Sequence, residues 1–534
     1  MGKNNSLKYV AVSLLLGYLV QPMQAKEAED KWTAFVDIEG KMGSKRHLGE
    51  IDFFIPLMQN SDSLFYTDIR YRADNSSSRE GNFGLGLRHI LPSDWIIGGY
   101  GYYDRRKSSY DNMFKQVTLG LEALSTDWDF RTNVYFPIGK DVYEVDAFNT
   151  AEISGTTISF RGGEEHSMKG YDAEIGWRVP LFDEQESHQV RLYAGGYRFY
   201  KDGLESIEGP RGRVELSFDE VPFLWEGSRF TLGAETQRDD VRGRQSFASF
   251  RLRIPFSTSK KSKKEKLSPI EKRMTTPIVR DVDIVSQAGT FGSPEIVSAA
   301  QNGFTVLDMT TIPTAAALNT ALSGVGATTV IASGNYDVSS QIRVQAGQTL
   351  IGGGSMKVVS PSGRSAVVNL PTLTLKSSSS LTGSLVTLSD NSTLKGANLH
   401  HVRQPYATSA TAISIQGKTG VVLENNTIYA DGTSSGIYII DAYNSQDVVI
   451  RGNTITGTAD NTRAAIGIRA IQASNLTVAD NDFRMLNGKD LYTIRADSTT
   501  SFNSASINNR ATNSECLIES TPIGSVGFTN ITCP

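Results

Sequence analysis

Carboxylates and arginines recur between residues 431 and 469, and these side chains are the best suited to chemistry in the chain. The set is Asp431, Asp441, Asp447, Asp460, Arg463 and Arg469. Cleavage of a polysaccharide needs a carboxylate pair, or clustered carboxylates beside a base. Aspartate is also common in solvated turns, where it does no chemistry. Two interpretations stay open: a polysaccharide-cleaving site at Asp431, Asp441, Asp447 and Arg469, or a set of turn residues.

Other catalytic signatures are missing from the sequence. We find no GxSxG, HExxH, P-loop or calcium-binding nonapeptide. His400 and His401 form an isolated pair, which we interpret as surface or ladder residues rather than metal ligands. The sequence therefore predicts no cofactor and no metal site.

The acidic residues lie within a repeat marked by asparagine. Its members are Asn398, Asn426, Asn453, Asn481 and Asn509, spaced 28, 27, 28 and 28 residues apart. A period near 28 with several short apolar strands per period is typical of a parallel β-helix, whose coils bury their apolar faces only by stacking. Asparagine can stack its amides at a bend and can adopt left-handed backbone geometry there. Tandem β-sandwiches, the alternative, need about 100 residues each.

The ends of this repeat region carry their own signals. Residues 314–322 predict a short amphipathic helix before the first coil, and residues 329–338 resemble the entry strand of pectate-lyase-like β-helices. Such a cap covers strand edges that would otherwise invite aggregation. Cys516 and Cys533 predict one disulfide stapling the last coil if the chain is exported, and two buried thiols if it is not.

The first half of the chain has a different rhythm, with a period of two residues. Twelve segments of about 9–12 residues alternate apolar with polar or glycine, as in outer-membrane barrels. They are 32–40, 47–55, 63–72, 80–90, 94–104, 113–124, 127–136, 168–178, 189–200, 209–218, 229–238 and 246–256. An even number puts both barrel ends in the periplasm, and the long connection from Gly139 to Ser167 then falls outside. A soluble β-sandwich is the alternative.

The last of these segments is the clearest. Phe250, Leu252, Ile254 and Phe256 share one face, whereas Arg251 and Arg253 share the other. An arginine facing lipid costs about 2–4 kcal/mol at the bilayer midplane, so we expect both arginines to face the lumen. The four apolar residues with their terminal aromatic resemble the signal that the barrel-assembly machinery reads.

Length, charge and the N-terminus agree with an exported membrane protein. The 534 residues exceed one domain, and a net charge of −4 does not favour nucleic acid as a partner. The longest apolar run, residues 9–20, is too short for a spanning helix, which needs about 20 residues. With Lys3 and Lys8 before it and a small residue at Ala25, it predicts a signal peptide cleaved after Ala25.

A basic segment joins the two halves. Residues 257–280 carry eight positive and two negative side chains. It is either a solvated linker or, if the barrel ends in the periplasm, the stretch that returns through the lumen; a core of about 30 Å is within its reach at about 3.3 Å per residue. We therefore expect a signal peptide at 1–25, a barrel at 26–256, a pore-threading linker at 257–289 and a β-helix at 290–534.

The export signal, the twelve segments and the stretch Glu271–Val285 resemble the intimin–invasin family of inverse autotransporters, over about residues 1–285. The resemblance implies type V secretion: the barrel inserts first and then exports a C-terminal passenger through its lumen. It also implies contact with outer-membrane lipid, the Sec translocon and the barrel-assembly machinery.

The family's usual passengers are immunoglobulin-like, so a β-helix is a departure. The fold class we expect is all-β, a 12-stranded antiparallel transmembrane barrel followed by a right-handed parallel β-helix. Three functions remain open. The first is an outer-membrane adhesin whose surface passenger contributes to virulence by binding a host-cell or glycan receptor or other bacteria. The second is an anchored polysaccharide lyase or glycoside hydrolase, and the third is a porin whose β-helix stays in the periplasm.

Overall fold

The computed structural model describes residues 31–183, 187–221, 224–256, 267–281, 283–326, 328–402, 409–432, 436–518 and 526–529. They form two compact units, one from the described residues of 31–145 and 164–291, the other from those of 146–163 and 292–529. The predicted all-β class is confirmed, since strands far outnumber helices in both. Within the described ranges, no helix has both the length and the apolar character needed to cross a membrane.

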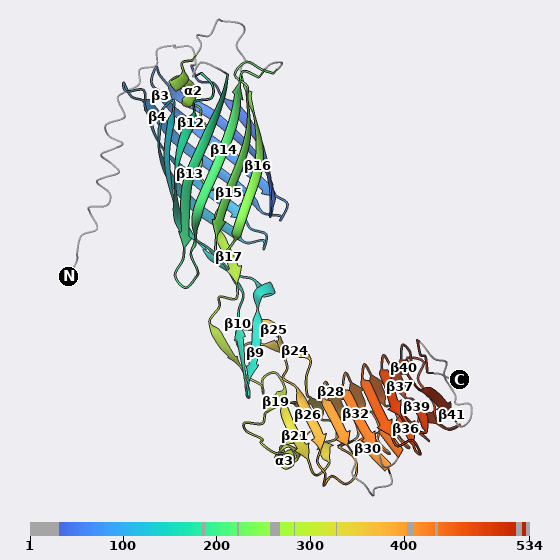
Figure 1. Cartoon of the computed structure of the whole chain (residues 1–534). Helices are drawn as coiled ribbons and strands as arrows, with labels where there is room; N and C mark the ends of the chain where they lie inside the picture. The colour runs from blue at the N-terminus through green and yellow to red at the C-terminus, as the bar shows by residue number, and fades with distance from the viewer. Residues whose placement is uncertain are drawn as a thin grey trace, which may run out of the picture. The chain divides into compact units, whose positions relative to one another are not determined.

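The first unit contains a closed antiparallel barrel of twelve strands (Figure 1), which confirms the twelve predicted segments. Its strands are β1 (Phe35–Gly43), β2 (His47–Gln59), β3 (Ser63–Asp74), β4 (Arg79–Ile90), β5 (Ile96–Lys107), β6 (Met113–Leu124), β7 (Trp128–Pro137), β12 (Lys169–Val179), β13 (His188–Tyr200), β14 (Ile207–Asp219), β15 (Arg229–Asp239) and β16 (Gly243–Pro255). The first and last strands close it, with Asp37 opposite Arg253.

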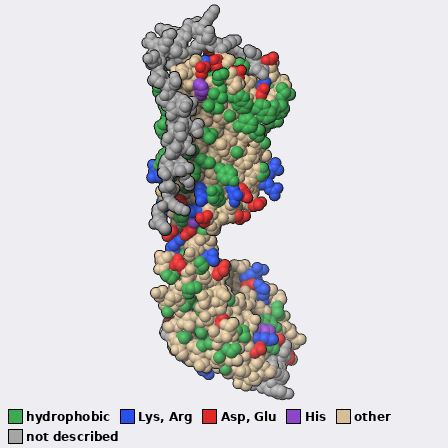
Figure 2. All heavy atoms as spheres, turned by 90° about the vertical axis from the view of Figure 1, so that its left-hand side faces the viewer, with side chains coloured by type: hydrophobic (Ala, Val, Ile, Leu, Met, Phe, Trp, Pro, Cys, Tyr) green, Lys and Arg blue, Asp and Glu red, His purple; other side chains and the backbone are tan. Residues whose placement is uncertain are grey.

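The barrel wall has an apolar outer face and a charged inner face. Hydrophobic side chains gather on its outside (Figure 2), and Phe250 and Phe256 are 45% and 47% exposed there. Arg251 and Arg253 point the other way and pair with Glu39 and Asp37 at 2.7 and 2.9 Å. The predicted lumen side of both arginines is confirmed, and the apolar belt is what lipid contact requires.

The connection between β7 and β12, which the sequence predicted only as a long polar loop, is mostly strands. It contains β8 (Val142–Glu144), the 3-10 helix η1 (Asp146–Phe148), β9 (Thr150–Ser154), β10 (Thr157–Arg161) and β11 (Glu164–Ser167). These strands have three to five residues. They are shorter than the barrel strands, which were predicted from their alternation of apolar and polar residues. They pair with one another, and β9, β10 and β11 also pair with strands in the second half of the chain, which local alternation cannot reveal.

After the barrel come a short helix α2 (Pro269–Arg273), then β17 (Ser286–Gly289) and β18 (Pro294–Val297). The predicted helix before the coils is confirmed as α3 (Ala315–Val325), whose first turn is capped by the Thr314 hydroxyl accepting from the Ala317 amide. Two antiparallel strands, β24 (Ser355–Val359) and β25 (Ser365–Asn369), project from the early coils.

Three parallel seven-stranded sheets build the β-helix in the second unit. The first sheet consists of β19 (Phe304–Leu307), β20 (Thr329–Ala332), β23 (Thr349–Ile351), β28 (Thr393–Lys395), β31 (Val422–Glu424), β34 (Val449–Arg451) and β37 (Thr477–Ala479). The second consists of β21 (Gly334–Val338), β26 (Leu373–Ser377), β29 (Asn398–Val402), β32 (Thr427–Gly432), β35 (Thr454–Ala459), β38 (Asp482–Asn487) and β40 (Arg510–Thr512). The third consists of β22 (Ile342–Val344), β27 (Val386–Leu388), β30 (Ser409–Ser414), β33 (Gly436–Asp441), β36 (Ala464–Ala470), β39 (Asp490–Ala496) and β41 (Glu515–Ile518).

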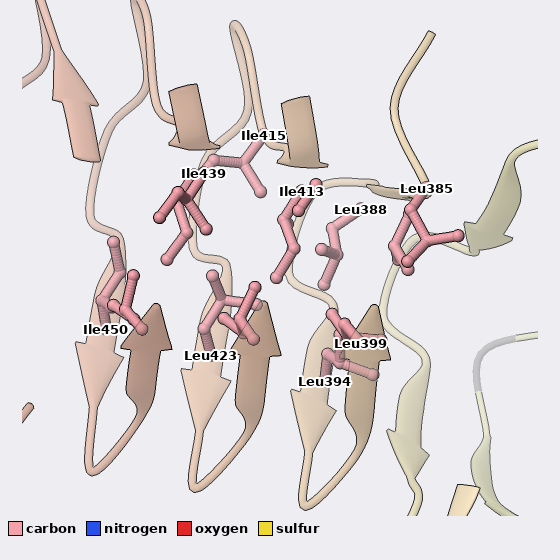
Figure 3. Close-up of a cluster of buried hydrophobic side chains, with 14 of the residues drawn as sticks. Leu385, Leu388, Leu394, Leu399, Ile413, Ile415, Leu423, Ile439 and Ile450 are labelled. Carbon is pink, nitrogen blue, oxygen red and sulfur yellow. The ribbon is translucent and has the colours of Figure 1, made fainter. Parts of the chain in front are cut away.

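Equivalent apolar side chains from successive coils stack inside these sheets. Leu394, Leu423 and Ile450 follow one another along the interior (Figure 3), and each is fully buried. Each coil therefore supplies part of one continuous core, the arrangement that makes single coils unstable and stacks stable.

Candidate functional site in the barrel lumen

The segment after the barrel enters the lumen at the end where the barrel chain begins. Helix α2 starts in a capping box, in which Ser268 accepts from the Glu271 amide and the Glu271 carboxylate accepts from the Ser268 amide. The indole N–H of Trp32, just before β1, donates to the Glu271 carbonyl oxygen at 2.9 Å. Lys31 forms an ion pair with the Glu271 carboxylate. These contacts fix the start of the lumen segment beside the N-terminal edge of β1.

At the end of the helix, charged lumen side chains hold the chain by a backbone carbonyl and by a side chain. The guanidinium of Arg88 is fully buried, pairs with Glu122 and donates to the Met274 carbonyl oxygen at 2.7 Å. Arg273 forms an ion pair with Asp129, which is also fully buried. Hydrogen bonds to charged groups are stronger than neutral ones, so this is a firm attachment.

The middle of the segment is held by polar side chains on β5 and β7. The Val279 carbonyl oxygen accepts from the Tyr100 hydroxyl at 3.4 Å and the Asn133 amide at 3.1 Å. The Tyr135 hydroxyl accepts from the Asp281 amide at 2.7 Å. Backbone groups that pair with no strand are thus satisfied by the wall.

At the other end the segment leaves beside the turns that follow β1, β3 and β5. Asp283 pairs with Arg46 and lies 3.5 Å from Arg72. The Ile284 amide donates to the Glu80 carboxylate at 2.9 Å. Strand β17 then pairs with β11 of the long connection. The described residues 267–281 and 283–285 therefore run from one end of the barrel to the other.

The lumen partners were not identified from sequence, although their strand positions carry a signal. Asp104, Asp129 and Arg88 occupy inward positions of the alternating strands. Of the eight basic linker residues, Arg273 and Arg280 make buried ion pairs. Lys260, Lys261, Lys263, Lys264 and Lys266 lie outside the described residues. What this arrangement can do is hold a chain inside the lumen through fixed charges and hydrogen-bond donors.

In the β-helix, the structure brings one pair of the predicted catalytic residues into contact. Arg469 lies 2.9 Å from the Asp441 carboxylate, in the neighbouring coil of the third sheet. Its guanidinium also lies over the rings of Tyr438 and Tyr443, at 4.9 and 5.0 Å from their centroids. Asp441 is 2% exposed and accepts from the Gln416 side chain as well. The carboxylate is thus engaged by partners on two sides.

The other candidates lie elsewhere. Asp431 belongs to β32 in the second sheet, and Asp447 sits in a turn with a positive φ of 53°. Asp460 also lies in a turn, where its carboxylate accepts from the Thr462 amide. For the predicted His400, burial lowers the pKa of the imidazole, and nearby Lys376 lowers it further. Within the described ranges, no group of acidic, histidine and cysteine side chains is arranged to hold a metal ion.

The asparagine ladder is present, shifted by one residue at its first predicted member. The amide nitrogens of Asn426, Asn453 and Asn481 each donate at 3.0 Å to the side-chain oxygen of the asparagine one coil on, ending at Asn509. Asn398 is not in the ladder. Ala397 occupies that position, its amide donating to the Asn426 side chain, while Asn398 is exposed and opposite Thr427.

Left-handed geometry in the ladder belongs to the residue before each ladder position. The positive-φ residues there are Gly396, Asn425, Gly452, Asp480 and Asn508. Sequence reasoning had assigned this geometry to the ladder asparagines. They stay buried because their amides replace backbone partners at the bend, while the preceding residue makes the turn.

Two remaining predictions reach outside the described residues, and a third lies within them. Ala25 and Cys533 lie there, and nothing is described of the Cys516 side chain beyond its place in β41. The apolar row of the last strand is described: Phe250 and Phe256 face outward, with Leu252 and Ile254 half-buried between them. The row faces the lipid side of the wall, and its role as an assembly signal stays a prediction.

Comparisons with known proteins agree with both units. Residues 18–202 match the family model described as inverse autotransporter, β-domain, and residues 377–530 match the right-handed β-helix region. These two matches confirm the resemblance to inverse autotransporters and the β-helix that the sequence predicted. A comparison with curated proteins finds no match.

Solved structures similar to this chain include several barrels. One, from work on the in-meso crystallization of membrane proteins, is 17% identical over 48% of this chain and 99% of its own, with a TM-score of 0.35. An outer membrane channel from Pseudomonas putida F1 is 9% identical over 44% and 100%, with a TM-score of 0.32. The translocator domain of the autotransporter NalP from Neisseria meningitidis is 9% identical over 43% and 90%, with a TM-score of 0.22.

Proposed function

We propose that this outer-membrane protein, which carries an inverse autotransporter β-domain followed by a right-handed β-helix, exports the β-helix through its own barrel and presents it on the cell surface as an adhesin. The predicted outer-membrane location and autotransporter class stand. What we propose beyond this is that the exported β-helix binds a receptor, which is a host surface, a glycan or another bacterium.

The observation that carries it is the path of the chain between Glu271 and Ile284. Glu271 is held beside Trp32 at the barrel's beginning, and Ile284 is held by Glu80 and Arg106 near the opposite turns. A chain that ran back into the periplasm would have no reason to fill the lumen with matched charges. An exported chain ends in this arrangement, because the stretch that joins the barrel to the exported passenger remains inside the lumen.

Protease added to intact cells tests the direction of export. With an epitope tag in the exposed turn at Gly417, the wild-type passenger is expected to bind antibody and to be cleaved by external protease. A periplasmic tagged protein is the control for membrane integrity. If the tag is reached only after the outer membrane is broken, the β-helix is periplasmic and the porin alternative holds.

Adhesion rather than polysaccharide cleavage is favoured by the state of Asp441. A catalytic acid or base needs access to substrate, yet this carboxylate is 2% exposed and paired with Arg469. The test incubates the full-length protein with pectin-like and host glycans and measures new reducing or unsaturated ends. If the protein is an adhesin, no new ends form. Cells that carry Asp441→Asn or Arg469→Gln should then bind these glycans as well as wild-type cells do. Product that disappears in both variants would establish the lyase or hydrolase instead.

A further inference from the structure

The hairpin β9–β10 comes from the barrel's own long connection, between barrel strands β7 and β12. Its two strands pair over five residues, from Thr157 opposite Ser154 to Arg161 opposite Thr150. Gly155 makes the turn with a φ of +57°. By chain connectivity the hairpin is part of the translocator half, but its packing partners are not.

Both edges of the hairpin are occupied by passenger strands. On one side β10 pairs antiparallel with β18, from Ile158 opposite Val297 to Arg161 opposite Pro294. On the other side β9 lies beside β25, with Ala151 opposite Val368. The strand order β18-β10-β9-β25-β24 puts the hairpin at the centre of the sheet (Figure 1). Without it, β18 has no neighbour in this sheet and β24–β25 is an isolated hairpin, which is marginal in water.

Hairpin side chains also fill the passenger's core. Phe160 and Ile158 are 0% and 1% exposed, and they share a hydrophobic cluster with Val297, Val358 and Val368. Since these passenger side chains are buried against the hairpin, its removal exposes apolar surface on β18, β24 and β25, which together we call the β-helix cap.

A polar clamp supports the same docking. Arg364, in the turn between β24 and β25, donates to the Asn149 side chain at 2.6 Å and to the Gly163 carbonyl oxygen at 2.8 Å. It also lies 3.1 Å from the Asp146 carboxylate, whose pKa is lowered by hydrogen bonds from Asn149 and from Arg364. A Cβ at Gly162 would meet the Arg364 guanidinium at 2.3 Å, so glycine makes room for the clamp.

The same connection also supplies β11, which pairs with β17, the strand just before β18. β11 pairs with β17, from Glu164 opposite Gly289 to Ser167 opposite Ser286. Thus β17 and β18, the first two strands after the lumen segment, each pair with a strand that the barrel half supplies. In the described residues each is the edge strand of its sheet, and its one strand neighbour comes from the barrel half.

We propose that the hairpin of residues 150–161 is a donated part of the passenger, a docking template on which β18 and then β25 fold and which afterwards anchors the β-helix cap. The order of events rests on the proposed export. The partner is therefore a segment of this same chain: the barrel half of the protein completes the fold of the half it exports.

The test uses the full chain in intact cells. Phe160→Asp puts a charge in the shared core, and Thr157→Asp places the same charge at an exposed position of the same strand as the matched control. A third variant replaces residues 150–161 with a glycine-serine linker. A fourth, Arg364→Ala, removes the passenger side chain that donates to Asn149 and Gly163. External protease is titrated against passenger fragmentation, and heat-modifiable migration reports whether the barrel itself is folded.

Phe160→Asp and the linker variant are expected to need about tenfold less protease, because cleavage tracks the population of the opened state. Arg364→Ala should shift in the same direction, and Thr157→Asp should match wild type, with barrel migration unchanged throughout. If Phe160→Asp and the linker variant resist protease as wild type does while the barrel is folded, the proposal that the hairpin is a template is wrong. A wild-type passenger that external protease cannot reach would instead overturn the export proposal, which keeps the two failures apart.

Discussion

The side-chain amide of Asn453 donates to the side-chain oxygen of Asn481 in the next coil at 3.0 Å, and both residues are 1% exposed. The Asn453 oxygen also accepts from the backbone amide of Asn426 at 2.9 Å, and its nitrogen donates to the Leu423 carbonyl at 3.0 Å. Each ladder residue thus ties three coils together. The interior bends of the β-helix depend on this chain of amides.

Replacing Asn453 with alanine is therefore expected to destabilise the β-helix. Each buried backbone group left without a partner costs about 1–3 kcal/mol, and both the Asn426 amide and the Leu423 carbonyl lose one. The measurement is thermal unfolding of the purified full-length protein in detergent, following the passenger transition. Asn398→Ala is the control: it lies on the surface one residue from the ladder and should change stability by less than about 0.5 kcal/mol. Equal effects from the two variants would contradict the ladder's role.

The second prediction concerns the ion pair between Arg280 of the lumen segment and Asp104 of β5, at 3.0 Å. Both side chains are buried, at 8% and 0% exposure, and Arg280 also lies over the Tyr102 ring at 4.4 Å. Asp104→Asn leaves the guanidinium without its counter-charge, and breaking a buried pair costs about 3–5 kcal/mol. The heat-modifiable transition of the barrel should move to lower temperature.

Arg105→Ala is the matched control for that prediction, because Arg105 is the next residue and faces outward. The double variant Asp104→Arg with Arg280→Asp should recover part of the loss. If Asp104→Asn melts like wild type, the pair contributes nothing to holding the segment.

The barrel wall was predictable because its rule is local: side chains two apart share a face, and only one face can meet lipid. The same rule placed Arg251 and Arg253 inside, but it could not reveal that Glu39 and Asp37 face them, since pairing depends on barrel closure. The β-helix was predictable from its period. The one-residue error at Asn398 arose because Ala397 fills the first ladder position, and spacing alone does not define register.

The hairpin of residues 150–161 could not be predicted as part of the passenger. Its alternation, with Ile158 and Phe160 on one face, indicates a short amphipathic strand. Its partner strands, however, lie in residues 294–369, and nothing local points to them. The lumen contacts share this difficulty, because Arg88 meets the Met274 carbonyl only when a distant segment fills the barrel.

The third prediction concerns Phe256, the aromatic residue that follows β16. Its ring stacks with Phe53 at 6.4 Å between centroids and is 47% exposed. Since we expect this ring to be part of the signal read during assembly, Phe256→Ala should lower the amount of folded barrel in the outer membrane. Phe83→Ala is the control, since Phe83 is 51% exposed on the same outer surface but in the middle of β4. If both variants lower the amount of folded barrel equally, the loss of apolar area explains the result and the signal role of Phe256 is contradicted.

The last prediction separates the lumen segment from the passenger as the element that closes the pore. A chain ended after Phe256 lacks every contact from Trp32–Glu271 to Glu80–Ile284, whereas a chain ended after Gly289 keeps them all. Without the segment, Asp104 loses Arg280, but Asp129 still has Arg131 and Arg191 as partners, at 3.1 and 3.2 Å, and Arg88 still has Glu122, so the barrel should still fold. In planar bilayers the shorter chain should form steady open channels, while the longer one stays closed with brief openings. Two equally closed chains would mean that wall side chains alone seal the lumen, and two equally open chains would mean that the passenger seals it.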